Sequence, residues 1–352
     1  MFKGRIAQSD LWRSGSGGYH TYRIPALAVT NDKTLLAFCE GRKHHRGDAG
    51  DIAMLVKRST DGGATWSEQR IVWDDPGHTN GNPAPVVDRQ TGVIHLLMTW
   101  NRGDDHERDI IAGRSQDTRR VFVAASADDG LTWHQPAEIT SAVKQKDWTW
   151  YATGPGHGIQ LQRGEAAGRL VIPCDHIVTG SKAHYSHVIY SDDHGATWHL
   201  GGRSPQPQVN ECAAAEISGG RLLLNMRSYR PDARARQVAI SYDGGLSWGE
   251  QRIDSQLIEP ICQASIIDYP NGSGLVFFAN PASETARVNM TLRGSQDYGE
   301  SWDSQLRLHG GPSAYSDLAI APDGRVLCLY EGGEAHPYEF LRLAFITLEM
   351  NP

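Results

Sequence analysis

An octapeptide that recurs five times constrains the fold of this chain more than any other feature of its sequence. Its copies are STDGGATW (59–66), SADDGLTW (126–133), SDDHGATW (191–198), SYDGGLSW (241–248) and SQDYGESW (295–302). Successive copies start 67, 65, 50 and 54 residues apart, and each carries Ser, Asp, Gly, Thr or Ser, and Trp at the same offsets. A repeat at this spacing, with several short strands per unit, is typical of a radial or stacked array of small sheets.

The stretches between the octapeptides predict strands. They contain short apolar or alternating runs such as GRLVIP, HVIYS, QVAIS and GRVLCLYE, which are bounded by Gly, Pro or Asp. Runs with helical periodicity and caps are hard to find, so we predict an all-β fold. The repeat spacing divides the 352 residues into about six units, which indicates a six-bladed β-propeller of four-stranded antiparallel sheets. We expect residues 1–352 to form this single domain.

The octapeptide itself is interpreted as part of the frame and not as the chemical machinery. Its Asp and Gly favour a tight turn, because the carboxylate accepts bonds from nearby amides and Gly tolerates positive φ. The Thr or Ser then starts the next strand, and the Trp packs beneath the hairpin. A calcium loop is the alternative, but with Asp61 counted as the first position the twelfth is Val72 instead of the expected glutamate.

Composition excludes several classes of function. The net charge is −7 and the basic residues are scattered, unlike the basic surface of a nucleic-acid-binding protein or a polybasic membrane anchor. The apolar runs are too short to span a bilayer, and MFKGRIAQSDLW has no apolar core of a signal peptide. The expected location is therefore cytoplasmic, or secreted or periplasmic if a leader was removed. The five distant cysteines show no metal spacing, so we expect buried free thiols and no bound metal.

The segment YHTYRIPALAV contains the first residue with chemical significance. Arg23 begins an apolar strand there, and a buried guanidinium is costly unless it meets a carboxylate or another anion. YRIP followed by several such octapeptides resembles the sialidase (neuraminidase) superfamily, in particular the bacterial and animal-type exo-sialidases. The resemblance extends from Tyr22 to Glu331. It implies that three arginines from different blades hold the carboxylate of sialic acid, a geometry suited to the planar guanidinium fork.

The arginines that the resemblance assigns to this clamp are Arg23, Arg227 in LLLNMRSY and Arg287 in TARVNMTLRGSQ. Arg293 competes with Arg287, but it directly precedes an octapeptide, where a surface charge beside a turn is the commoner case. We therefore prefer Arg287.

The segment FCEGRKHHRGDAGDI supplies a further arginine and an acid. The resemblance implies that Arg42 contacts a substituent of the sugar ring and that Asp48, six residues later, is the general acid and base. Asp51 is the alternative acid, although its place at the start of the next strand favours a structural role. The two histidines between them, at 44 and 45, are expected to be solvated.

A tyrosine and a glutamate complete the predicted catalytic set. The resemblance implies that Tyr315 in GPSAYSDLAI is the nucleophile and that Glu211 in VNECAAAEI is its base. Glu216 lies five positions on, so it faces the other side of a strand. A phenol suits this sugar because its anomeric carbon bears a carboxylate, which would repel a charged nucleophile. We expect the arginines to lower the pKa of the tyrosine, and Glu331 in CLYEGG to brace the first arginine.

The residues that determine specificity are less defined by the sequence. KDWTWYATGPGHGI and WNRGDDHERD are similar to stretches of bacterial members. The substrate-binding candidates from these segments and from HYSH are Trp148, Trp150, Asn101, Glu107, Asp104 and Tyr185. Core packing is an equal alternative for either tryptophan.

The resemblance implies an exo-α-sialidase that hydrolyses terminal sialic acids from glycans, glycoproteins or glycolipids with retention, without a cofactor. Three alternatives remain open. They are transfer in place of hydrolysis, action on Kdn or Kdo glycosides, and a non-catalytic propeller that only binds glycans or proteins. No nucleic-acid partner and no membrane insertion are expected, and linkage preference and oligomeric state are not predicted.

Overall fold

The computed structural model describes residues 3–270 and 273–349. Within these residues nearly every element is a β-strand, and the helical elements are α1 (Glu107–Ile111), α2 (Thr140–Val143) and the 3₁₀ turn η1 (Ser218–Gly220). The predicted all-β class is therefore confirmed. None of the described helices has the length and apolar character needed to cross a membrane.

The first half of the chain forms two sheets of mostly antiparallel strands. One contains β2 (Thr21–Val29), β3 (Leu35–Arg42), β4 (Ile52–Ser59), β5 (Arg70–Trp73), β6 (His78–Val87), β7 (Ile94–Arg102), β8 (Arg120–Ser126) and β9 (Ala137–Glu138). A single parallel pair of residues, Ile52 and Thr79, joins its β2–β5 half to its β6–β9 half. The other contains β10 (Trp148–Thr153), β11 (Ile159–Gln160), β12 (Leu170–Val178), β13 (His184–Ser191) and β14 (His199–Arg203).

The strands that follow β14 form two further antiparallel sheets, the second of which also contains the N-terminal strand. One contains β15 (Val209–Ile217), β16 (Arg221–Ser228), β17 (Ala235–Ser241) and β18 (Arg252–Ile258). The other contains β19 (Ser265–Asp268), β20 (Val276–Pro281), β21 (Val288–Ser295), β22 (Ser304–Ile320), β23 (Val326–Gly332), β24 (Phe340–Glu349) and β1 (Lys3–Arg13).

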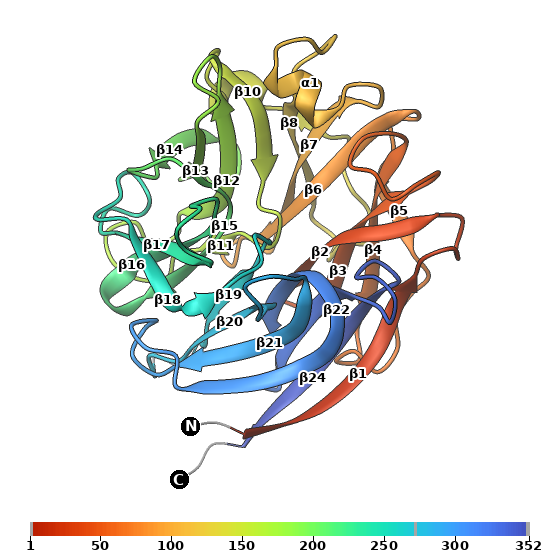
Figure 1. The fold of residues 1–352 in the computed structure, drawn as a ribbon. Coiled ribbons are helices and arrows are strands. Elements are labelled where there is room, and N and C mark those ends of the chain that lie inside the picture. Colours follow the sequence, from red (N-terminus) through yellow and green to blue (C-terminus); the bar gives the residue numbers. More distant parts are fainter. Residues whose placement is uncertain (1–2, 271–272, 350–352) are drawn as a thin grey trace.

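The sheets follow one another around the molecule in chain order, and the first and last strands lie side by side (Figure 1). Strand β22 is long enough to pair with β21 over its first part and with β23 over its second part. Strand β1 then pairs with β24 from Lys3↔Glu349 to Arg13↔Phe340. The N-terminal strand therefore completes the sheet built by the C-terminal strands.

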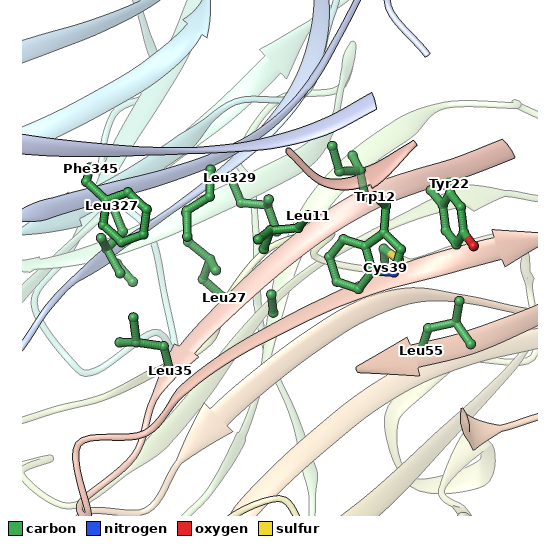
Figure 2. Close-up of a cluster of buried hydrophobic side chains, with 14 of the residues drawn as sticks. Leu11, Trp12, Tyr22, Leu27, Leu35, Cys39, Leu55, Leu327, Leu329 and Phe345 are labelled. Atoms are coloured by element: carbon green, nitrogen blue, oxygen red, sulfur yellow. The ribbon is translucent and has the colours of Figure 1, made fainter. Parts of the chain in front are cut away.

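The apolar clusters draw their side chains from neighbouring groups of strands, in several cases from two different sheets. Figure 2 shows one cluster, whose side chains come mainly from β1, β2, β3, β4, β23 and β24. Three of its members, Trp12, Leu27 and Leu329, are each at most 3% exposed. The five octapeptide tryptophans pack into five different clusters, in the order Trp66, Trp133, Trp198, Trp248 and Trp302. The expectation that each tryptophan packs beneath its hairpin is confirmed.

The octapeptides form one hydrogen-bond pattern, which the copy at 191–198 illustrates. The Ser191 hydroxyl donates to Asp193 at 2.8 Å and accepts the Gly195 amide, while the Asp193 carboxylate accepts the Thr197 amide at 2.9 Å and the Thr197 hydroxyl. The same bonds occur in the other four copies. The bonds from Thr197 lower the pKa of Asp193 to about 2.

We expect Asp193→Ala to lower the free energy of unfolding by about 1–2 kcal/mol, because three donors lose their acceptor. Equilibrium denaturation with guanidinium chloride measures this loss. Because the octapeptide is part of the frame, turnover of the folded variant should stay within about twofold of wild type. A loss of turnover without a loss of stability would contradict this interpretation.

Candidate active site

Nine of the predicted site residues line a single pocket of about 210 Å³. They are Arg23, Arg42, Asp48, Glu107, Trp150, Glu211, Arg227, Arg287 and Tyr315. The sequence separates them by up to 292 positions, and they come from β2, β3, α1, β10, β15, β16, β22 and the loops beside them. The fold therefore brings together most of the residues that the sequence analysis selected.

A bulge in β2 directs Arg23 into the pocket. The pairing of β2 with β3 shifts between Arg23 and Ala26, and Ile24 within this bulge has φ +60°. This backbone conformation is strained for a β-branched residue and persists only where its surroundings hold it. The amide of Ile24 donates to a carboxylate oxygen of Glu331 at 2.9 Å, so Glu331 supplies part of that restraint.

Glu331 is also the partner of the Arg23 guanidinium. Its carboxylate accepts Nε of Arg23 at 2.9 Å and Nη2 at 3.3 Å, and it accepts the Tyr315 amide at 3.1 Å. Glu331 is fully buried and lies behind the pocket, while Arg23 is 5% exposed. Glu331 thus contacts Arg23 as predicted for a brace, and it leaves Nη1 of Arg23 to face the pocket, where it donates to Asp48.

Arg42 has an equivalent carboxylate partner that the sequence analysis missed. Glu40, two residues earlier on β3, accepts Nε and Nη2 of Arg42 at 3.0 and 2.6 Å, and it also accepts the Asn82 amide. A Cβ on Gly81 would come within 2.4 Å of the Glu40 carboxylate, so a larger residue there would displace it. The period-2 alternation of a strand places residues 40 and 42 on one face and was the available signal.

Asp48 lies at the entrance of the pocket between two arginines. Its Oδ1 accepts Nη1 of Arg42 at 2.7 Å and Nη1 of Arg23 at 3.0 Å, while the side chain remains 64% exposed. Burial raises its pKa, but Arg42 and then Arg23 outweigh that effect and lower the pKa to about 2. Without a ligand Asp48 is therefore an ionised carboxylate.

The alternatives to Asp48 in this loop lie elsewhere. Asp51 forms an ion pair with Lys43 at 2.9 Å and does not line the pocket, which agrees with a structural role. His44 is 73% exposed, as expected for a solvated histidine. Over residues 3–270 and 273–349, no group of three His, Cys, Asp or Glu side chains is arranged to hold a metal ion. All five cysteines are buried free thiols, as the sequence predicts.

Tyr315 and Glu211 form a hydrogen-bonded pair on the floor of the pocket. The Tyr315 hydroxyl donates to Oε1 of Glu211 at 2.5 Å, and Arg227 donates to Oε2 of Glu211 at 2.6 Å and to the Tyr315 hydroxyl at 3.3 Å. Tyr315 is 7% exposed and Glu211 is 8% exposed. Glu216, the rejected alternative, binds the amides of residues 162 and 163 and lines a different cavity.

The arginines lower the pKa of Tyr315 as expected, but burial and Glu211 outweigh them, so the net shift is upward. Burial raises the pKa of the phenol well above its usual range and Glu211 raises it further, whereas Arg227, Arg287 and Arg23 lower it by less. Desolvation wins because the hydroxyl is enclosed and already donates to a carboxylate. Without a ligand Tyr315 is therefore a neutral phenol whose proton is directed at Glu211.

Arg287 and not Arg293 reaches the pocket. Arg287 donates to the Tyr338 hydroxyl at 3.1 Å and to the Ile261 carbonyl at 3.3 Å, and its guanidinium lies 5.7 Å from the Tyr315 ring centroid. Arg293 is buried at 6% exposure and donates to Asn280. The expectation that Arg293 is a surface charge is wrong, but the preference for Arg287 as a pocket residue is confirmed.

The predicted aromatic wall is only half correct. Trp150 lines the pocket, and the guanidinium carbon of Arg119 lies over its ring, 4.0 Å from the ring centroid. Trp148 lies in the core, where it stacks on His176 at 3.4 Å. The register of β10 shifts between Trp148 and Tyr151, so this bulge turns Trp148 to the core face although it is two residues from Trp150.

Four further candidates differ in whether they line the pocket. Glu107, in the first turn of α1, lines the pocket, whereas Asp104 is exposed and pairs with Arg102. Tyr185 lies outside the pocket on β13, beneath Arg203. Asn101 is 1% exposed and accepts Arg119 at 2.8 Å. It therefore positions Arg119 and does not line the pocket.

The pocket also contains residues that the sequence analysis did not select. They are Ile24, Glu40, Asn82, Arg119, Ala152, Asp175, Asn210, Tyr229 and Tyr338. Asp175 had a usable signal, because it interrupts the apolar run LVIPCDHIV and a charged residue inside a buried strand requires a reason. Tyr229 and Tyr338 lie in loops that follow or precede strands, and no local pattern marks them.

The comparisons with known proteins agree on one family. Residues 33–328 match the family model of the BNR repeat-like domain. The chain is 36% identical over 356 residues to a sialidase of Micromonospora viridifaciens, covering 96% of this chain and 54% of that protein. It is 32% identical to Sialidase-3 of Homo sapiens, covering 96% of this chain and 92% of that protein. Among solved structures, the Hadza microbial sialidase Hz136 matches with a TM-score of 0.85 and 30% identity, over 96% of this chain and 67% of that one.

The fold and the pocket together therefore define a BNR-repeat protein, and the chain belongs to the sialidase family. It spans only 54% and 62% of the bacterial sialidases from M. viridifaciens and Bacteroides fragilis. An intramolecular trans-sialidase from Ruminococcus gnavus has a TM-score of 0.79 at 18% identity, which supports the likeness of fold alone.

Proposed function

We propose that the chain is an exo-α-sialidase, a retaining glycoside hydrolase that removes terminal sialic acids from glycans, glycoproteins or glycolipids. The observation that carries the proposal is the combination of three pocket arginines with the hydrogen-bonded pair Tyr315–Glu211. Arg23, Arg227 and Arg287 form the carboxylate clamp, since each presents guanidinium donors to the same cavity.

In the proposed first step the Tyr315 oxygen bonds to the anomeric carbon while the glycosidic C–O bond breaks. Glu211 takes the phenolic proton along the existing 2.5 Å hydrogen bond. A neutral phenol approaches the anionic sugar without charge repulsion, and Arg227 stabilises the negative charge that develops on the pair. The product of this step is a glycosyl-tyrosine, and its hydrolysis gives retention at the anomeric carbon.

Asp48 is the proposed acid and base. In the free enzyme its charge is balanced by Arg42 and Arg23. When the substrate carboxylate pairs with Arg23, that guanidinium no longer stabilises the Asp48 anion as strongly, so the pKa of Asp48 rises on binding. Asp48 can then protonate the leaving oxygen and, in the second step, remove a proton from the attacking water.

The finer architecture is also part of the proposal. The strand groups β2–β5, β6–β9, β10–β14, β15–β18, β19–β22 and β22–β24 with β1 are six blades of a single propeller domain over residues 1–352. The arrangement of the sheets around one pocket and the pairing of β1 with β24 support this assignment.

The test is release of 4-methylumbelliferone from its α-N-acetylneuraminide by the purified chain. We expect steady turnover, with the α-anomer of the sugar as the first product in proton NMR. If only the Kdn or the Kdo glycoside were hydrolysed, the chain would still be a glycoside hydrolase, but its substrate would be a different sugar. An absence of turnover with all three glycosides would contradict the proposed activity and favour a propeller that only binds.

Asp48→Asn is expected to lower kcat/KM for sialyllactose by about 10²–10⁴-fold, because the galactoside oxygen requires protonation as it leaves. The loss with the methylumbelliferyl substrate should be much smaller, since a phenolate leaves without full protonation. Asp51→Asn is the matched control and should change neither value by more than about threefold. Equal losses with both substrates would contradict the role of Asp48 as general acid.

A further inference from the structure

Asp175 is a buried carboxyl group of the pocket that the proposed reaction does not use. It lies on β12 opposite Ala152 of β10, it lines the pocket, and it is 1% exposed. Both its Oδ1 and its Oδ2 are buried without a hydrogen-bond partner. A carboxylate in this position would be buried without any hydrogen-bond donor, which is strongly unfavourable, so the neutral carboxylic acid is the favoured form.

The electrostatic surroundings support the neutral form. Burial raises the pKa of Asp175 well above its usual range, Glu211 and Glu107 raise it further, and Arg119 and Arg227 lower it by less. The other titratable groups close enough to interact are Tyr151, Cys174, Cys212 and Tyr229. The pocket is lined by five arginines and five carboxyl groups, so a neutral Asp175 leaves it with a net positive charge for an anionic sugar.

The position of Asp175 determines which part of the sugar it meets. The clamp arginines come from β2, β16 and the residue that precedes β21, while Asp175, Trp150 and Asn82 come from β12, β10 and β6 on the other wall. A sialic acid carries its carboxylate on C2, and C5 is the opposite corner of the six-membered ring. A sugar held by its carboxylate therefore directs its C5 substituent toward the wall that carries Asn82, Trp150 and Asp175.

We propose that Asp175, as a neutral acid, donates a hydrogen bond to the acyl oxygen of the C5 substituent and so selects N-acylated sialic acids over Kdn. A protonated carboxyl group offers one O–H donor, and here that donor has no partner within the protein. The hydroxyl on C5 of Kdn ends closer to the ring and is too short to reach it. This inference rests on the proposed function and deepens it.

The test compares Asp175→Asn with Asp175→Leu on the methylumbelliferyl glycosides of N-acetylneuraminic acid and of Kdn. Asparagine keeps a neutral donor, so kcat/KM for the N-acetyl substrate should remain within about fivefold of wild type. Leucine removes the donor at similar volume and should lower that kcat/KM by about 10–100-fold, mainly through KM. Turnover of Kdn should change by less than about threefold in either variant, so the preference for the N-acetyl sugar shrinks only with leucine.

A binding measurement separates this inference from the activity itself. Calorimetry with the 2,3-didehydro-2-deoxy form of N-acetylneuraminic acid should rank the affinities of the three proteins in the same order. The wild type and the asparagine variant should bind tightly, and only the leucine variant should bind weakly. If the wild type binds this sugar but does not hydrolyse the glycosides, the proposed function fails while the ranking still tests Asp175. Equal losses for asparagine and leucine, undiminished binding by the leucine variant, or no binding by the wild type would each overturn the inference.

Discussion

Tyr315→Phe is expected to lower kcat for 4-methylumbelliferyl N-acetylneuraminide by roughly 10³-fold or more, because phenylalanine cannot form the glycosyl bond. The substitution removes one oxygen, which donates to Glu211 at 2.5 Å and accepts Arg227. It leaves the ring between Arg23 and Arg287 in place. Binding of the didehydro sugar should therefore fall by less than about tenfold, since the clamp arginines remain.

Tyr338→Phe is the matched control for this substitution. Tyr338 lines the same pocket and its hydroxyl also accepts an arginine, Arg287, at 3.1 Å. It has no carboxylate partner among its bonds, so it is not expected to act as a nucleophile. Its loss should raise KM with little change in kcat. If the two variants lost kcat to the same extent, the assignment of Tyr315 would be wrong.

Glu331→Ala should reduce the free energy of unfolding by about 3–5 kcal/mol, because it leaves a buried guanidinium with only the exposed Asp48 as its carboxylate partner. Glu331 is fully buried, Arg23 is 5% exposed, and the amides of Ile24 and Tyr315 lose their acceptor as well. The substitution acts on the backbone bulge that positions Arg23 and on the strand that carries Tyr315. We therefore expect activity to be lost even below the unfolding temperature.

A solvent-exposed ion pair provides the comparison for the buried pair of Glu331 and Arg23. Arg5 and Glu349 pair at 2.8 Å with side chains 87% and 48% exposed, and Glu349→Ala should cost less than about 1 kcal/mol. Chemical denaturation of both variants in one buffer gives the difference. A cost for Glu331→Ala that is no larger than the cost for Glu349→Ala would show that the pocket does not depend on this brace.

The regular features of the chain were predictable because they depend on local rules. The octapeptides specify a turn through the hydrogen bonds of their Ser, Asp and Gly. Their tryptophans pack against the apolar side chains of the neighbouring strands. The main pocket residues were predictable through the family resemblance, since Arg23, Arg227 and Tyr315 stand in recognisable motifs. No spacing argument alone joins residues that are nearly 300 positions apart.

The errors arise where local patterns do not determine geometry. A bulge in β10 places Trp148 in the core and Trp150 in the pocket, which strict alternation does not predict. The pKa of Tyr315 depends on how completely the phenol is buried, and the sequence contains no measure of that. Asp175 interrupts an apolar run, but only the folded chain shows that neither of its oxygens has a partner.

The most direct test of the central claim, that Tyr315 is the covalent nucleophile of a sialidase, uses 2,3-difluorosialic acid. The C2–F bond breaks as the tyrosine oxygen bonds to C2, fluoride leaves, and Glu211 takes the phenolic proton. Peptide mass spectrometry should place the fluorosugar on Tyr315, and Tyr315→Phe should remain unlabelled. An adduct on Asp48 or Glu211, or no adduct on an enzyme that hydrolyses the methylumbelliferyl substrate, would contradict the account.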